Sequence, residues 1–599
     1  MFENMGKKTK AAVAGKFCEP ADFDKLSPDT HKRILDFLNA ATDPEELMFR
    51  REIPILEEGE VGHGPTHPEL EQKPETILNP ELARAILEFR EREFPLGFRN
   101  LKELLPVRVG RPDLERLIWI FGPIFYGRWS VFPQRIPHKG PDTYEGVIHA
   151  AVLHTGKVLF ITAAQSTLLW DPENATPATF EDPVNQPHTM PGGYSQLCGH
   201  HVFLSDGKLL SVGGGGYGHN PLASWGYKFD PVSRSWARTS GPMSESKWYP
   251  TAVALGDKRV LVVCGHGSGD MDIYDEATDT FSPVSLVEKP FPYLYPGLHL
   301  LPNHSIFYSR TGWGSAGPGG GPYRSPSDDQ SAFFTMTGRT SGVWQDVAPA
   351  PSNITDRTKG MSVMLLGCDA PFVRILVVGG ADPSTNDTYS FFDATVMSPM
   401  QQWGFSLLHP DREHRSLASA VILPDGNVFV CGGIQRVNSP CTLFNAHTNN
   451  WSPMAALPSI RDYHSVAVLL PSGKVAMAGW NNTAIEVYSP PYLFRGPRPT
   501  ITSAPAGIHY GQQFSVTSPE ANSISRAVLV RPMAVTHQTD TEQKLIELRV
   551  YHDHSVANKL VLTAPRSTHP NSYAQPGYYM LFILNNLGVP SVAKWVNLH

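Results

Sequence analysis

Seven copies of one sequence pattern, spaced by about 50 residues, dominate this 599-residue chain. Each copy consists of an apolar run, a polar turn, a second apolar run and, in most copies, a closing glycine. The copies begin near His149, His200, Thr251, Gly297, Met361, Ser419 and Ser465. Several continue into a second strand pair that ends in tryptophan or phenylalanine, as in YKFDPVSRSWA. Repeats of this length with four strands each close into a ring with protected edges, so the pattern predicts a seven-bladed β-propeller.

The composition supports an all-β fold. Charged residues make up only 18% of the chain, whereas glycine (51) and proline (54) are abundant, which is typical of turn-rich β proteins. The glycine pairs and late aromatic residues resemble kelch repeats, and we expect a kelch-type propeller over residues 121–496.

A net charge of −7 argues against a nucleic-acid partner, because phosphate binding needs a basic face. The six cysteines show no spacing that predicts a disulfide framework or a zinc ribbon.

The segments that flank the repeats have different patterns. Residues 497–599 contain short alternating strands, such as QQFSVTS and KLVLTAP, and predict a C-terminal Ig-like β-sandwich. Residues 1–120 predict a small, mainly helical N-terminal segment, because Pro28 and Pro80 each stand at the start of an amphipathic pattern. Two short helices of this kind indicate a packing module, and its role is unknown.

The chain contains no recognisable targeting or membrane segment. The N-terminal residues lack the apolar core of a signal peptide, and no stretch approaches the ~20 apolar residues of a membrane span. These patterns predict a soluble protein without a membrane span, cytoplasmic as read.

Candidate functional residues recur at one position of the repeats. Cys198, Tyr249, Tyr295 and His464 each stand six residues before the leucine that precedes a turn, and Tyr463 lies beside His464. Because equivalent positions of the innermost strands surround the axis of a propeller at one level, we expect these side chains to converge.

Two interpretations of this cluster are open from the residues alone. A single tyrosine or cysteine at the start of a strand is usually part of the core. Two phenols and an imidazole in one place instead suit a tetragonal Cu(II) site better than a tetrahedral zinc site. Copper binding would deprotonate a phenol whose ordinary pKa is about 10.

Several motifs resemble the radical-copper oxidases, the family that includes galactose oxidase and glyoxal oxidase. The resemblance covers roughly residues 126–599. Its motifs are Leu197-Cys198-Gly199, the glyoxal-oxidase-like Lys247-Trp248-Tyr249-Pro250, the run from Arg461 to Ser465, Val535-Thr536-His537, and the last strands from Gly577 to Ser591.

The resemblance implies a metal site and a cofactor made from the protein. One copper ion would be held by Tyr249, Tyr463, His464 and His537. Cys198 would be joined to Tyr249 by a thioether, which forms once copper and oxygen are present. Tyr249 would carry a radical and Tyr463 would accept the hydroxyl proton of the substrate, so Cys198, Tyr249 and Tyr463 are the predicted catalytic residues.

The activity implied by the resemblance is the oxidation of small aldehydes, as hydrates, or of primary alcohols. Dioxygen would be reduced to hydrogen peroxide, and an activating oxidant or a peroxidase would be a partner. The family is usually secreted, in contrast to the missing signal peptide. The alternative hypothesis is a non-catalytic kelch scaffold that binds partner proteins and retains the copper site.

The chain departs from galactose oxidase in the predicted pocket. Galactose oxidase stacks a tryptophan over the thioether, whereas the aligned residue here is Gly267. We expect another side chain to shield the radical, with His266, Tyr295 and Trp313 as candidates for this role and for the pocket wall. The arginine that binds galactose has no counterpart, which argues against galactose as the substrate.

Overall fold

The computed structural model describes most of the chain from residue 126 onwards and short segments before it. The described residues are 34–35, 38–39, 80–93, 101–107, 126–137, 146–162, 166–176, 179–190, 193, 195–215, 221–263, 265, 271–285, 294–312, 331–347, 357, 359–366, 373–380, 388–393, 402–403, 407–409, 413–479, 481–552, 556–566 and 574–599. The chain divides into two compact units: residues 1–130 with 489–497, and residues 131–488 with 498–599.

The first unit contains helix α6 (Pro80–Glu93) and the 3₁₀ helices η1 (Leu101–Val107) and η6 (Pro491–Phe494). The start of α6 at Pro80 confirms the predicted helix, and Leu82 and Ile86 are buried as its amphipathic pattern requires. The Arg90 guanidinium donates to Leu38 O at 2.7 Å, which ties α6 to the helical residues near 38. No helix in the described ranges is long and apolar enough to cross a membrane.

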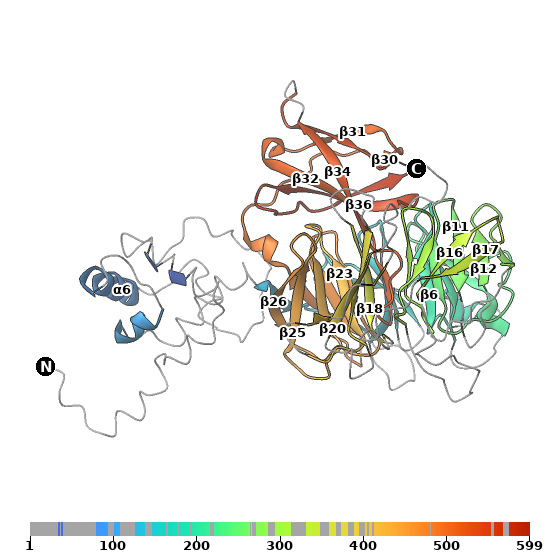
Figure 1. Cartoon of the computed structure of the whole chain (residues 1–599), viewed down its shortest axis with the longest axis horizontal. Helices are drawn as coiled ribbons and strands as arrows, with labels where there is room; N and C mark the ends of the chain where they lie inside the picture. The colour runs from blue at the N-terminus through green and yellow to red at the C-terminus, as the bar shows by residue number, and fades with distance from the viewer. Residues whose placement is uncertain are drawn as a thin grey trace. The chain divides into compact units, whose positions relative to one another are not determined.

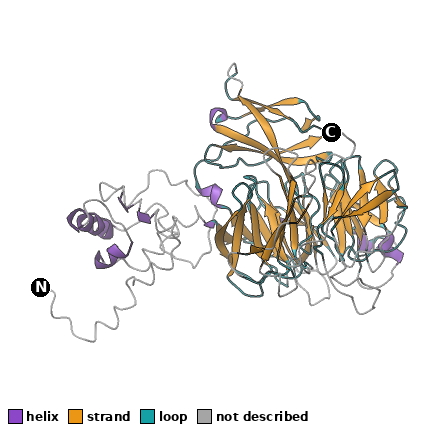
Figure 2. Ribbon diagram, viewed as in Figure 1, coloured by secondary structure: helices purple, strands orange, loops and turns teal. Residues whose placement is uncertain are grey.

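The second unit begins with seven antiparallel sheets that form the blades of the propeller, and Figure 2 shows how strands dominate this part of the molecule. The first four blades contain β2 (Val147–Val152), β3 (Val158–Thr162), β4 (Thr167–Trp170), β5 (Phe180–Glu181); β6 (Gly199–Phe203), β7 (Leu209–Gly213), β8 (Gly226–Asp230), β9 (Ser235–Arg238); β10 (Thr251–Ala254), β11 (Arg259–Val263), β12 (Met271–Asp275), β13 (Thr280–Pro283); and β14 (Leu298–Leu300), β15 (Ile306–Tyr308), β16 (Ala332–Met336), β17 (Gly342–Asp346).

The other three blades complete the ring. They contain β18 (Met361–Leu366), β19 (Val373–Val378), β20 (Thr388–Asp393), β21 (Gln402–Trp403), β22 (Leu407–Leu408); β23 (Ala418–Ile422), β24 (Val428–Gly432), β25 (Ser439–Asn445), β26 (Asn450–Leu457); and β27 (Ser465–Leu469), β28 (Val475–Gly479), β29 (Glu486–Ser489) with β1 (Arg128–Val131). The last blade joins both ends of the propeller sequence: just after β1, Phe132 N donates to Ile485 O at 2.8 Å. The predicted seven-bladed ring is therefore confirmed.

Each inner strand starts within two residues of its predicted start. Most inner and second strands, such as β2 and β3, are buried along their whole length, because neighbouring blades cover both of their faces. Burial on both faces explains why these strands appear in the sequence as continuous apolar runs and not as alternating ones.

A buried arginine and a glycine recur where one blade meets the next. The arginine precedes an inner strand and donates to the carbonyl of the glycine at the end of the second strand of the same blade. The pairs are Arg357 with Gly379 (3.0 Å), Arg415 with Gly432 (3.3 Å), and Arg461 with Gly479. These contacts satisfy carbonyls that would otherwise be buried without a hydrogen bond.

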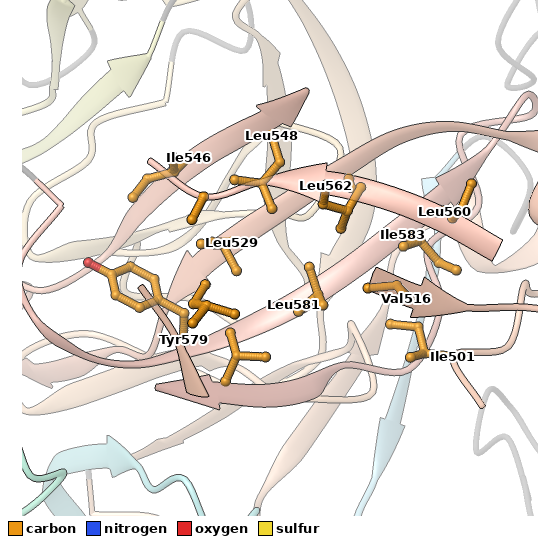
Figure 3. Packing of buried hydrophobic residues seen from close by; sticks show 14 of the residues in the cluster. Ile501, Val516, Leu529, Ile546, Leu548, Leu560, Leu562, Tyr579, Leu581 and Ile583 are labelled. Carbon is orange, nitrogen blue, oxygen red and sulfur yellow. The ribbon is translucent and has the colours of Figure 1, made fainter. Parts of the chain in front are cut away.

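The C-terminal strands form the predicted Ig-like domain. They are β30 (Gly507–Ile508), β31 (Gln513–Thr517), β32 (Ile524–Arg531), β34 (Lys544–His552), β35 (Lys559–Thr563), β36 (Gly577–Asn585) and β37 (Lys594–Leu598). Long strand β34 pairs with β32 on one side and with β35 on the other, which links the two layers. Figure 3 shows the core between the layers, with Leu529, Leu562 and Leu581 among its buried side chains.

This domain is attached to the inner strands of the propeller blades, and Figure 1 shows its orange to red strands beside the propeller. Thr541 Oγ1 donates to Ala252 O at 2.7 Å, Gln575 Nε2 to Ala254 O at 2.7 Å, and Gln543 Nε2 to Ala420 O at 3.0 Å. In addition, β33 (Ala534–Thr536) leaves the domain and pairs with β2 as a fifth strand of that blade. The sequence did not predict this extra strand.

Candidate metal centre

The candidate site begins with an unusual backbone conformation that recurs once in each blade. A residue one to three positions before each inner strand has a positive φ: Gly146 (94°), Cys198 (64°), Tyr249 (58°), Tyr295 (48°), Lys359 (59°), Leu417 (65°) and His464 (66°). Side chains other than glycine rarely adopt this conformation, and it persists where the surrounding structure enforces it. Backbone hydrogen bonds connect neighbouring members, such as Leu417 N to Lys359 O at 2.7 Å. This belt places one side chain at the start of the inner strand in six of the seven blades, since the member in the remaining blade is Gly146.

Two phenols of the belt region meet directly. The hydroxyl groups of Tyr249 and Tyr463 form a hydrogen bond. Burial raises the pKa of both phenols above the ordinary value, more strongly for Tyr249. Both groups are therefore protonated in the metal-free protein, and a bound cation would have to displace their protons.

The side chain of His537 lies among the belt residues although it belongs to the C-terminal domain. Strand β33 leads into a turn in which His537 has a φ of 47°. The ring centroid of His537 lies 4.9 Å from that of Tyr249, 4.8 Å from Tyr295, 5.3 Å from Tyr463 and 4.6 Å from His464. The structure therefore brings Tyr249, Tyr463, His464 and His537 together, and their role as copper ligands stays a prediction.

A hydrogen bond fixes the orientation of the His537 ring. Nδ1 lies 2.7 Å from Thr536 Oγ1, and that hydroxyl lies 3.3 Å from Ile148 O. When the hydroxyl donates to the Ile148 carbonyl, it accepts from Nδ1–H, and the lone pair of His537 is then on Nε2. Metal-binding histidines are commonly oriented by such a second contact.

The imidazoles are neutral, as metal binding requires. Burial lowers the pKa of His464 to about 4. The pKa of His537 lies well below its ordinary value, because of burial and then of the nearby His464, His149 and His200. The Nε2 atom of His464 is buried and has no hydrogen-bond partner in the described part of the protein, which is costly unless a ligand binds there.

Cys198 is placed for reaction with Tyr249. Tyr249 N donates to Cys198 O at 3.0 Å, so the two belt positions are directly linked. Burial raises the pKa of the Cys198 thiol to about 12, and the neighbouring Tyr249 and Trp248 side chains act in the opposite direction. Cys198 packs with Tyr249 in one buried cluster, and its thiol is protonated in the metal-free protein.

Of the three candidates for shielding Tyr249, only Tyr295 lies within the described residues. Its ring stacks on Tyr249, with centroids 4.5 Å apart and 24° between the planes. His266, Trp313 and Gly267 lie outside the described residues. The sequence analysis missed Trp248, which stacks on Tyr249 at 4.2 Å and 17°. The only signal for it was its place in the Trp-Tyr-Pro motif.

The donor atoms fit a copper ion. Two phenol oxygens and two imidazole nitrogens suit the tetragonal N,O coordination of Cu(II). Among the described residues, no three His, Cys, Asp or Glu side chains are grouped to hold a metal. That finding is consistent with a site in which tyrosines supply half of the donors.

Comparison with known proteins agrees with this geometry. Residues 498–598 match the domain family described as "Galactose oxidase-like, Early set domain". The chain is 29% identical over 458 residues to "Aldehyde oxidase GLOX" of Vitis pseudoreticulata, an alignment that covers 67% of this chain and 81% of the relative. It is 30% identical over 487 residues to "Putative aldehyde oxidase Art an 7" of Artemisia annua, covering 69% and 76%. The alignment with "Galactose oxidase" of Gibberella zeae, at 27% identity, covers 67% of this chain but only 61% of that relative.

A solved structure shares the fold. A fungal alcohol oxidase "among the AA5 family, in complex with copper" superposes with a TM-score of 0.62 at 22% identity, covering 79% of this chain and 99% of that one. The propeller, the C-terminal domain and the converging phenols and imidazoles thus define a radical-copper oxidase architecture. The chain belongs to the galactose oxidase and glyoxal oxidase family of copper-radical oxidases.

Proposed function

We propose that this protein oxidises small aldehydes, as their hydrates, or primary alcohols, and transfers the two electrons to dioxygen. The observation that supports this proposal most directly is the convergence of Tyr249, Tyr463, His464 and His537 from two blades and the C-terminal domain. These four residues would hold the copper ion. When bound, copper supplies a one-electron redox centre, which pairs with an oxidisable tyrosine to give a two-electron oxidant.

The residues of the chain have separate tasks in this reaction. The Tyr463 phenolate accepts the hydroxyl proton of the substrate, and the oxidised Tyr249 ring takes a hydrogen atom from the substrate carbon. The contact between Cys198 and Tyr249 supports a thioether between them, and a sulfur substituent makes the ring easier to oxidise. For an aldehyde hydrate the balance is R–CH(OH)₂ + O₂ → R–COOH + H₂O₂.

Two features of the sequence support aldehydes over galactose as the substrate class. The Trp248-Tyr249-Pro250 motif has the glyoxal-oxidase form, and an arginine for galactose has no counterpart. A hydrated aldehyde presents the same H–C–OH unit to Tyr463 and Tyr249 as an alcohol does. We therefore expect glycolaldehyde or methylglyoxal to be better substrates than galactose.

The proposal is tested by loading the purified protein with copper in air. A digest should contain a Cys198–Tyr249 peptide that is two hydrogens lighter than its parts, and peroxide should be released from glycolaldehyde, methylglyoxal and glyoxal faster than from galactose at equal concentration. The Cys198→Ala variant is the control for the cross-link. A Cys198 that remains fully alkylatable, together with no peroxide from any substrate, would favour the alternative of a non-catalytic kelch scaffold.

A further inference from the structure

Aromatic side chains cover both faces of the Tyr249 ring. Trp248 stacks on it at 4.2 Å and Tyr295 at 4.5 Å, both nearly parallel to it. Two rings that are both nearly parallel to Tyr249 at these centroid distances cannot occupy the same face of it, so Trp248 and Tyr295 cover different faces. Tyr295 is fully buried, whereas Trp248 is half-buried. Among the described residues, Trp248 is therefore the stacked ring that lies between Tyr249 and solvent.

Tyr295 also belongs to a closed set of hydrogen bonds that joins three neighbouring blades. Tyr249 N donates to Cys198 O at 3.0 Å, and Tyr295 N donates to Tyr249 O at 2.9 Å. The Tyr295 hydroxyl returns to the first of these blades and donates to Gly199 O at 2.8 Å. These three bonds fix the backbones of Cys198, Tyr249 and Tyr295 relative to one another, and the Tyr295 ring that they hold stacks on the ring of Tyr249.

The backbone at Trp248 is held by a buried ion pair. Lys247 Nζ lies 3.2 Å from Asp272 Oδ2, and both side chains are buried. Asp272 also accepts hydrogen bonds from Ser244 N at 2.9 Å and from Ser244 Oγ at 3.0 Å. On the other side, a Cβ at Gly265 would lie 3.0 Å from Trp248 N. This close packing restricts the backbone of Trp248, whose indole lies over Tyr249.

We propose that Trp248 and Tyr295 are positioning residues with different tasks toward Tyr249. Trp248 shields the oxidised ring from solvent, and Tyr295 holds the ring beside Cys198 so that the thioether forms. In that step the S–H bond of Cys198 and a ring C–H bond of Tyr249 break and a C–S bond forms. The two electrons and two protons go to dioxygen, which leaves as hydrogen peroxide. This inference rests on the proposed function.

The two tasks are separated by three variants and a matched control. Trp248→Ala removes the shield, Trp248→Phe keeps a smaller ring, and Tyr295→Phe keeps the ring but removes the bond to Gly199 O. Trp225→Phe is the control, because Trp225 is a half-buried tryptophan that packs under Arg238 outside the site. The measurements are the time course of the cross-linked peptide and the half-life of the oxidised Tyr249 absorption band. A third measurement is the rate at which Cys198 is alkylated in copper-free protein.

Trp248→Ala should shorten the half-life of the oxidised state about tenfold and Trp248→Phe by less, because a smaller or absent ring leaves one face of Tyr249 open. Tyr295→Phe should slow cross-linking about tenfold and speed the alkylation of Cys198, since one closing hydrogen bond is lost. Trp225→Phe should change none of these. A Trp248→Ala protein with the parent's half-life, or a Tyr295→Phe protein with the parent's cross-linking and alkylation rates, overturns the corresponding task. If the parent itself forms no cross-link, the proposed function fails. The positioning task of Tyr295 is then tested by comparing the rate of Cys198 alkylation in copper-free Tyr295→Phe with that in the copper-free parent.

Discussion

At the scale of single residues, the candidate centre depends on side chains that are presented from strained backbone. Cys198, Tyr249, His464 and His537 all have positive φ, a conformation that costs an L residue about 1 kcal/mol or more. The strain is maintained by the backbone hydrogen bonds of the belt and, at His537, by the contact with Thr536. Strain that is retained at a cluster of ligating groups is consistent with a preorganised site.

His537→Ala should abolish tight copper binding, because it removes the donor that the C-terminal domain contributes. Thr536→Val keeps the imidazole but removes the hydroxyl that orients it, and should weaken copper binding by about 10–100-fold. Copper affinity is measured by competition with a chelator, and the thermal midpoint is recorded to exclude misfolding. His509→Ala is the control, since His509 packs on His599 in the same domain but outside the site. Parent-like affinity of His537→Ala would show that the ligand set is wrong.

At the scale of elements, close backbone contacts require glycine at the end of a second strand, as at Gly379 and Gly479. A Cβ at Gly379 would lie 2.2 Å from Arg415 O, and one at Gly479 would lie 2.2 Å from His464 O. In both cases the obstructing atom is a backbone carbonyl of a segment that leads into an inner strand. Gly479 therefore allows the segment that bears His464 to pack close to its own blade, and Gly379 does the same for the Arg415 segment of the next blade.

Gly479→Ala should destabilise the protein by more than about 2 kcal/mol and also weaken copper binding, because the backbone of His464 must move away from the new Cβ. Gly156→Ala is the matched control: its φ is 86°, but a Cβ there would meet nothing within 4 Å. That variant should lose only about 1 kcal/mol from the unfavourable φ. Urea denaturation of the copper-free proteins measures both values. Equal losses would mean that the contact with His464 O has no effect.

The blades were predictable from the sequence, whereas the connections between distant elements were not. The apolar runs from His149 to Ser465 set the period and the register, because burial on both faces leaves a continuous pattern. By contrast, β33 has three residues and pairs with β2, far away in the sequence, and no local pattern encodes such a partner. The stacking of Trp248 on Tyr249 is likewise a matter of side-chain packing between neighbouring residues, which periodicity does not report.

At the scale of the whole molecule, the propeller contains several buried histidines whose pKa is lowered. His149, His200, His201 and His537 are fully buried, and the pKa of each is lowered first of all by burial. His149 Nδ1 lies 3.3 Å from His201 Nε2, so these two rings share a hydrogen bond. These buried imidazoles therefore bind protons more readily in the unfolded chain than in the folded protein.

The stability of the copper-free protein should fall as the pH falls from about 6.5 to 4. In the unfolded chain each imidazole becomes protonated near pH 6.5. In the folded protein burial lowers these pKa values, and His201 becomes protonated only near pH 4. A single group of this kind contributes about 3 kcal/mol above pH 6.5 that is lost toward pH 4. Asp540 acts in the opposite sense, because burial raises its pKa to about 7, but it is one group against several imidazoles. Urea denaturation between about pH 4.5 and about pH 7.5 measures how the free energy of unfolding depends on pH. A free energy of unfolding that does not change over this range would contradict this account.

The pairing of β33 with β2 has a consequence for the order of events during biosynthesis. The phenols and one imidazole are present once the propeller sequence has been made, but His537 arrives only with the last domain and is held by strands that extend to residue 598. A chain that stops before residue 537 therefore lacks one of the four proposed copper donors. Under the proposed function, copper chemistry would begin only after the C-terminal domain has been made and β33 has paired with β2.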